Sequence, residues 1–223
     1  MDTFRIDLIL ENHRELFFGA AMTLKITCVS FVVALVIGTL VGIARSRPGR
    51  LNLVLTPYVE VFRGTPLLIQ LFFIYYGLPA VGISMDCFTA AYLGIGLCGG
   101  AYISEIIRGS LYAVDKGQEE AAVSLGLSRF QSLRHIILPQ AIQVALPSLV
   151  NSFSSQLKET SLVSVLAINE LTRAGQMVYS RTFSPFEIYL AVGAMYFFMT
   201  YTVSILSRHL EKTFHVSGKI TRA

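Results

Sequence analysis

Four charged residues lie within, or at the edge of, long apolar stretches, where an unpaired charge costs at least about 2.5–3.5 kcal/mol on insertion scales. These residues are Lys25, Glu60, Arg63 and Glu105. A zwitterion such as an amino acid needs a cation for its carboxylate and an anion for its amine, so Glu60 and Arg63 form a candidate ligand pair. They are three residues apart and share one helical face. The alternative is an ion pair that neutralises itself within the helix and fixes its packing.

Neighbouring residues extend this candidate pathway. Gly64 and Pro66 are placed to break the helix near mid-membrane, which would free backbone groups for ligand contact. The full set of pathway candidates is Glu60, Arg63, Thr65, Gln70, Glu159, Thr160 and Ser161. Lys25 is near enough to the end of its span to reach the surface. Glu105 has Arg108 on the same helical face and is expected to have a structural role.

A second group of residues has a fixed spacing in the longest polar loop. It reads Glu120-Ala121-Ala122, three residues, Gly126, nine residues, Ile136, one residue, Leu138 and Pro139. Gly126 supplies the left-handed residue that ends a helix cheaply. Pro139 lacks an amide hydrogen and marks the entry into the next span. The loop therefore predicts two short helices, on which Glu120 offers a charge and Ala121 and Ala122 leave room for a partner surface.

Start signals support this hairpin, which covers residues 115–139. Asp115 is followed three residues later by Gln118, and Ser128 is followed three residues later by Gln131. Both pairs have the spacing of a capping box, in which each side chain bonds the backbone of the other residue. Two capped helices separated by Gly126 are therefore expected.

The elements that must position these residues are membrane helices. The chain of 223 residues is 53% hydrophobic and 14% charged, against roughly 25% charged in ordinary globular proteins. The mean hydropathy is +0.60, and the apolar residues form runs of about 20, the length that crosses a bilayer. The sequence predicts one all-α integral membrane domain over residues 1–223, without a cleavable signal peptide.

Five transmembrane helices are expected, near residues 17–44, 54–78, 88–107, 138–157 and 187–207. Eleven Lys and Arg residues fall in the first loop, the hairpin loop and the tail, against five in the alternate regions. This bias predicts the N-terminus outside and the C-terminus inside. The hairpin then lies in the cytoplasm between the third and fourth spans. Glycines in the third span are expected to allow close helix packing.

Composition and motifs disfavour several classes of function. The net charge of +4 comes from basic residues dispersed between apolar runs, which is not a nucleic-acid footprint. Three cysteines, two of them in apolar segments, give no disulfide framework and no metal spacing. All four histidines lie outside the spans or at their edges, which disfavours an intramembrane enzyme. The chain has no G-x-x-x-x-G-K-[ST] phosphate loop, so any ATP hydrolysis must occur on another chain.

The spacing from Glu120 to Pro139 resembles the EAA signature by which permease subunits of bacterial ATP-binding cassette importers dock on their ATPase. Further segments resemble the polar amino acid branch of these permeases, which includes the cystine and histidine/arginine/glutamine importers. They are residues 62–67, 75–79, 115–118, 138–141 and 158–162. The run from Arg63 to Pro79 is most similar to the cystine type. Cys98-Gly99-Gly100 departs from the pattern, since many relatives carry Asn or Ser there, and this weakens the inference about substrate.

The resemblance implies a multi-pass permease subunit in the bacterial cytoplasmic (inner) membrane, with cystine as the first choice of amino acid. An extracytoplasmic binding protein would deliver the substrate, and a separate ATPase dimer would bind ATP, so the chain itself needs no cofactor. A two-fold ATPase offers two docking grooves, which requires a second permease subunit, either a copy of this chain or a sister. The coupling residues in this interpretation are Glu120, Ala121, Ala122, Gly126, Ile136, Leu138 and Pro139.

Two alternatives remain at the level of sequence. A stand-alone secondary transporter or channel would favour inverted repeats, which the sequence does not show, and would leave the hairpin without a purpose. A purely scaffolding membrane subunit is distinguished only by a transport assay.

Overall fold

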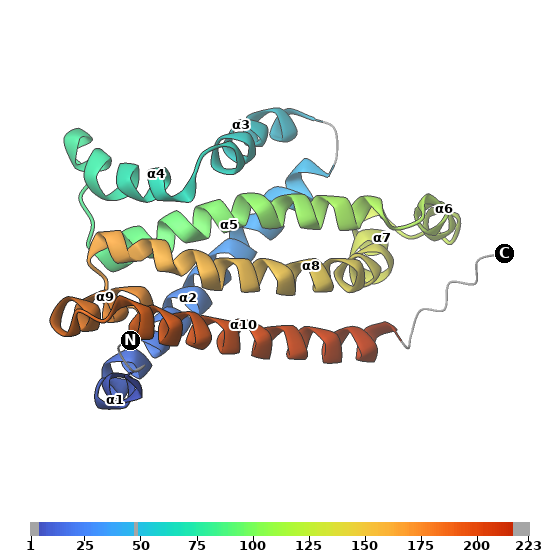
Figure 1. Ribbon diagram of the computed structural model, residues 1–223. Helices are drawn as coiled ribbons and strands as arrows, with labels where there is room; N and C mark the ends of the chain where they lie inside the picture. The colour runs from blue at the N-terminus through green and yellow to red at the C-terminus, as the bar shows by residue number, and fades with distance from the viewer. Residues whose placement is uncertain (1–4, 47–48, 216–223) are drawn as a thin grey trace.

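The computed structural model describes residues 5–46 and 49–215, with side chains as far as Arg208. This part of the chain is built from helices and their connections, without strands (Figure 1). The helices are α1 (Ile6–Glu11), α2 (His13–Arg45), α3 (Arg50–Gly64), α4 (Leu67–Phe72), α5 (Cys87–Tyr112), α6 (Lys116–Ser124), α7 (Arg129–Ser132), α8 (Leu138–Glu159), α9 (Leu171–Thr182) and α10 (Pro185–His215). Shorter turns are π-helical at Phe73–Gly77 and Leu133–Ile137, and 3-10 at Leu78–Val81 and Thr160–Leu166.

Five stretches have the length and hydropathy of membrane spans, as predicted. Four are single helices, and the fifth is a pair of helices joined by a sharp bend. Figure 1 shows α2, α5, α8 and α10 running between two ends of the molecule, with α6 and α7 at one end and α1 and α9 at the other. The charge bias predicts the α6 end to be cytoplasmic. Arg47, Lys219 and Arg222, which contribute to that bias, lie outside the described residues.

Glycines let α2 and α5 pack closely along their length. A Cβ atom added to Gly38 would lie 2.6 Å from the Cβ of Ile103, and one added to Gly96 would lie 2.7 Å from Cγ1 of Val33. Such separations are too short for any larger residue, so the contact depends on glycine from both helices. This confirms the expected use of small residues for close approach.

The second span is broken where Gly64 and Pro66 predicted a break. The segments Arg50–Gly64 and Leu67–Val81 meet at 109°. The buried side chain of Gln70 donates from Nε2 to the backbone oxygens of Phe62 and Thr65, both at 2.9 Å. Carbonyls freed by the break are thus bonded within the same segment, which a helix break in a membrane requires.

Helix α9 covers the end of the molecule opposite α6. With 12 residues it is too short to span a bilayer, and its start is capped by Glu170, which is fully buried. The Glu170 carboxylate accepts hydrogen bonds from the backbone amides of Thr172 (2.9 Å) and Arg173 (2.8 Å) and from the hydroxyl of Tyr196 (2.8 Å). The prediction of spans did not include this element, because its length and polarity hide it from a search for apolar runs.

Pro139 lies in the first turn of α8, at the passage into the fourth span as predicted, but the helix is not interrupted there. Helix α7, the π-helical turn Leu133–Ile137 and α8 follow one another without a break, and residues 129–166 form a single candidate span. Proline is tolerated in the first turn of a helix or beside a widened π turn, because the missing amide hydrogen then leaves few carbonyls unbonded. The second helix of the hairpin is therefore an extension of α8.

Candidate functional site

The hairpin folds from the local signals that its sequence carries. Asp115 caps α6 by accepting a hydrogen bond from the backbone amide of Gly117 at 2.7 Å. Gly126 has a φ of 81°, and its amide donates to the carbonyl of Val123 at 2.9 Å. This left-handed residue ends α6, as predicted. The hairpin therefore has its sharp turn where the sequence signature places its glycine.

Only one of the two predicted capping boxes forms. Ser128 and Gln131 bond reciprocally, with the Ser128 amide donating to Oε1 of Gln131 at 2.9 Å and the Gln131 amide donating to Oγ of Ser128 at 3.3 Å. Gln118 instead accepts a bond from Nε2 of Gln140 at 3.4 Å. This contact ties α6 to the first turn of α8.

The coupling candidates divide into an exposed set and a buried set. Glu120 and Ala121 are exposed on α6. Ala122 is fully buried, so the expectation that it faces a partner is wrong. The amide of Leu127 donates to the Ala122 carbonyl at 3.1 Å, and a larger side chain there would push the arms of the hairpin apart. Of the coupling candidates that follow Gly126, Ile136 and Leu138 are half-buried and Pro139 is exposed.

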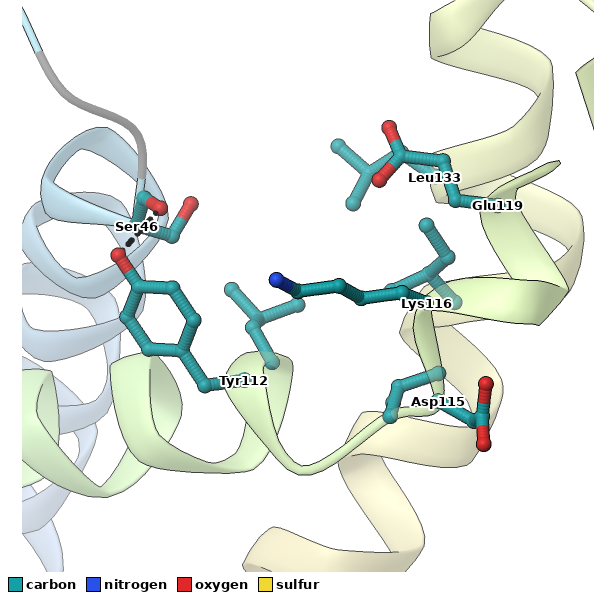
Figure 2. A pocket seen from close by; sticks show the side chains of 9 residues that line it. Ser46, Tyr112, Asp115, Lys116, Glu119 and Leu133 are labelled. Carbon is teal, nitrogen blue, oxygen red and sulfur yellow. Dashed lines mark hydrogen bonds between the residues drawn. The ribbon is translucent and has the colours of Figure 1, made fainter.

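A small cavity of about 180 Å³ lies between the hairpin and the ends of α2 and α5. Figure 2 shows Lys116 extending across it from α6 toward Tyr112, while Glu119 and Leu133 line the opposite wall. The Tyr112 hydroxyl donates to the backbone oxygen of Ser46 at 2.8 Å and so joins the ends of α5 and α2. The hairpin is thereby seated on the ends of the two most closely packed helices.

Glu105 is the centre of a cluster of ion pairs near the α6 end of α5. Its oxygens lie 2.5 Å from Nη1 of Arg45 and 2.6 Å from Nη2 of Arg108. Arg63 lies further away, at 3.9 Å. The alternative ion pair of Glu60 with Arg63 does not form among the described residues. Arg63 instead faces α5, where its guanidinium also lies over the ring of Tyr102 at 5.5 Å. The predicted pairing of Glu105 with Arg108 is confirmed.

A cavity of about 550 Å³, with many polar residues in its lining, lies between α3, α5 and α8, and its volume is within the usual range of ligand sites. Its lining residues are Arg63, Gly99, Tyr102, Glu105, Ile106, Ser148, Asn151, Ser152, Ser155, Gln156 and Glu159. Ser148, Asn151 and Ser155 are exposed, so the cavity opens to one side of the molecule. We call it the α5–α8 cavity. It brings the cation of Arg63 and the carboxylate of Glu159 to the same space.

The other five pathway candidates do not line this cavity, and their contacts explain why. Thr65 and Gln70 hold the helix break, with Oγ1 of Thr65 donating to the Val61 carbonyl at 2.7 Å. The hydroxyls of Thr160 and Ser161 donate to backbone carbonyls three residues earlier, each at 2.7 Å. Glu60 is exposed. The polar groups of these residues thus form hydrogen bonds at the helix break or with nearby backbone carbonyls, or lie at the surface.

The sequence prediction missed the polar face of α8. Ser148, Ser152, Ser155 and Glu159 are spaced by four, three and four residues, which places them on one side of a helix. Periodicity within the fourth apolar run would have revealed this face. Gln156, Asn151 and Tyr102 needed the packing of α5 against α8 before they could be assigned. No group of three or more His, Cys, Asp or Glu side chains suited to a metal occurs in residues 5–46 and 49–208.

Comparison with known proteins places this fold in a family. Residues 34–216 match the family of binding-protein-dependent transport system inner membrane components. The glutamine transport system permease protein GlnP of Escherichia coli K12 is 42% identical over 197 residues, which cover 87% of this chain and 90% of that protein. The probable amino-acid permease protein YxeN of Bacillus subtilis is 38% identical over 216 residues, 95% of this chain and 96% of that protein.

Solved structures agree with this result. The crystal structure of an amino acid ABC transporter with histidines contains a chain of TM-score 0.88 and 37% identity, with 96% of this chain and 99% of that chain covered. An inward-facing structure of the MetNI methionine ABC transporter shares the fold at TM-score 0.70 and 19% identity, with 96% and 99% covered. The sequence match, the relatives and the shared helical fold show that this chain belongs to the family of binding-protein-dependent transport system inner membrane components.

Proposed function

We propose that this permease subunit carries a polar amino acid through the α5–α8 cavity and is driven by an ATPase that docks on the hairpin. One observation carries the proposal. Residues 129–166 form one span, with the hairpin at one end and the Glu159 wall of the cavity at the other. Movement of the hairpin can therefore be transmitted to the cavity through this one continuous segment.

The chemistry of the cavity supports a zwitterionic substrate. Arg63 offers a guanidinium whose ion pair with Glu105 is at 3.9 Å, beyond hydrogen-bond distance. Its planar fork can bind a carboxylate in bidentate geometry. Glu159 offers a carboxylate for the α-amino group, and the serine hydroxyls of α8 supply neutral partners. Both ends of an amino acid thus find a complement.

The choice of amino acid is the finer part of the proposal. The segment from Arg63 to Pro79 favours cystine by its resemblance, whereas the relatives at 37–42% identity include permeases named for glutamine transport. We place both in the candidate set, with glutamine first on the strength of these relatives. Family membership implies an extracytoplasmic binding protein and an ATPase as partners, and a single hairpin implies a second permease subunit, self or sister.

Purification from the native membrane in mild detergent, followed by mass spectrometry, tests the docking. We expect an ATPase in equal ratio with permease subunits, two of each. Gly126→Ala should lower the amount of ATPase recovered, because an alanine at a φ of 81° costs about 1–2 kcal/mol and distorts the hairpin. Gly82→Ala is the matched control, since Gly82 has a φ of 85° at the end of the 3-10 turn Leu78–Val81, away from the hairpin.

A charge reversal tests the exposed hairpin carboxylate. Glu120→Lys should reduce ATPase recovery, whereas Glu11→Lys, also exposed but on α1, should leave it unchanged. ATP-dependent uptake of L-glutamine and L-cystine by proteoliposomes of the purified complex then tests transport. A permease that purifies alone, or a complex that accumulates neither these nor other amino acids, would refute the proposal and favour a stand-alone carrier or channel.

A further inference from the structure

Gln156 has an environment that the packing of α8 does not explain. Its side chain is 2% exposed and lies at the wall of the α5–α8 cavity. Neither its amide nitrogen nor its amide oxygen has a hydrogen-bond partner among the described residues. Buried polar atoms in proteins are nearly always bonded, and each exception calls for an explanation. An unbonded carboxamide in a cavity wall is explained by a ligand that enters the cavity.

The opposite helix is shaped to accept this side chain. A Cβ atom added to Gly99 would overlap the amide nitrogen of Gln156 and lie 2.9 Å from its carboxamide carbon. The same Cβ would lie 3.1 Å from the Cβ of Ala34, so the backbone has no slack on the far side. Gly99 therefore makes the space in which the amide lies.

The position of Gln156 complements that of the charged residues. Arg63 and Glu159 line the same cavity and match the carboxylate and amine that all amino acids share. Gln156 adds a neutral group with two donor hydrogens and one acceptor oxygen. The charge of an ionised substrate side chain would be poorly compensated by the neutral amide of Gln156. An apolar substrate side chain would leave this amide without a hydrogen bond. The best match is a substrate side chain that both donates and accepts.

We propose that Gln156 is a specificity-determining residue that hydrogen-bonds the side chain of the transported amino acid and selects a carboxamide side chain such as that of glutamine. This inference rests on the proposed function of the α5–α8 cavity. The amide lies against Gly99, and rotation of the Gln156 side chain brings it to the substrate. Arg63 and Glu159 hold the common part of the amino acid, and Gln156 reads the variable part.

Equilibrium binding to the purified permease–ATPase complex, without the binding protein, tests this assignment. The probe is radiolabelled L-glutamine, with L-glutamate, L-leucine and L-cystine as competitors. Gln156→Leu should weaken glutamine binding about tenfold, the usual effect of losing one hydrogen bond to a buried group. Leucine binding should be unchanged or stronger, so that the glutamine-to-leucine preference falls by at least the same factor. Gln156→Asn, which keeps a shorter amide, should retain part of that preference.

Gln143→Leu is the matched control, because Gln143 is exposed on the same helix and does not line the cavity. Equal ATPase recovery from all variants shows that they are folded. A Gln156→Leu complex with wild-type affinity and preference overturns the inference. A wild-type complex that takes up cystine but neither binds nor takes up glutamine also overturns it, while the proposed transport function stands. A wild-type complex that takes up no amino acid refutes the proposed function itself.

Discussion

The packing of Gly99 against Gln156 leads to a prediction in which one substitution changes sign with its background. Gly99→Ala adds a methyl group where the Gln156 amide lies. In a helix interior, alanine is favoured over glycine by about 0.8–1.0 kcal/mol. Overpacking typically costs about 1–3 kcal/mol. The net effect in the wild-type background is therefore a loss of roughly 0–2 kcal/mol.

The same substitution should be stabilising once the amide is removed. In a Gln156→Ala background the overlap is gone and the helix preference for alanine remains, so Gly99→Ala should gain up to about 1 kcal/mol. The tight contact with Ala34 is common to both backgrounds and cancels in a double-mutant cycle. The predicted coupling is the overpacking cost, about 1–3 kcal/mol. For a chain of this size it corresponds to roughly 2–12 °C in midpoint temperature.

Thermal denaturation of the purified complex in one detergent, for the wild type, both single variants and the double variant, measures this coupling. The two shifts caused by Gly99→Ala should have opposite signs, or differ by at least about 2 °C. Equal shifts in the two backgrounds would show that the amide does not occupy the space above Gly99. The placement of Gln156 at the cavity wall would then be wrong.

Three further perturbations follow from the packing and the charges. Glu105→Gln leaves the buried guanidinium of Arg45 beside a neutral amide. The loss of about 3 kcal/mol of stability should lower the midpoint temperature by at least about 6 °C. An unchanged midpoint would show that this cluster does not stabilise the fold. Hydrogen bonds at the start of α5, the one from the Thr89 side chain foremost, lower the pKa of the Asp86 carboxyl below 3.8. The stabilisation from this carboxylate is therefore present above pH 3.8 and is lost as the pH falls through the lowered pKa. A series of melting curves from pH 6 to pH 2 should show a decline in midpoint temperature that Asp86→Asn lacks. Gly38→Ala should lower the midpoint because its Cβ would lie 2.6 Å from a neighbouring side chain, whereas Gly193→Ala, with open space around it, should raise or preserve the midpoint; the same response from both would refute the close α2–α5 contact.

Local chemistry in the sequence was sufficient for much of the fold. Runs of apolar residues predict the five spans, and Gly64 with Pro66 predicts the break, because both signals depend only on neighbours in the chain. Gly126 and the pair of Ser128 and Gln131 end and start helices for the same reason. Each of these signals is complete within a few residues.

The site depended on contacts that no local pattern contains. Arg63 forms an ion pair with Glu105 on α5 at 3.9 Å and not with Glu60, one turn earlier on its own helix. Gln156 is singled out by the absence of hydrogen-bond partners for its amide among the described residues and by the position of Gly99 opposite it. Neither feature can be recognised from the sequence of α8. The polar loop predicts an accessible Ala122, whereas its burial comes from packing that the motif itself does not contain. Such assignments require knowledge of which helices touch.

The broken second span also has a consequence for how the protein enters the membrane. Neither Arg50–Gly64 nor Leu67–Val81, each about 22 Å long as an ideal helix, crosses a hydrocarbon layer of about 30 Å alone. The amide of Gln70 satisfies the carbonyls at the bend from within the same segment. The segment can therefore leave the translocation machinery already bent and internally bonded, before α5 has been synthesised. Replacement of the Gln70 amide would therefore act first during biogenesis, through failed insertion and degradation of the nascent chain. Any effect on transport would come only afterwards.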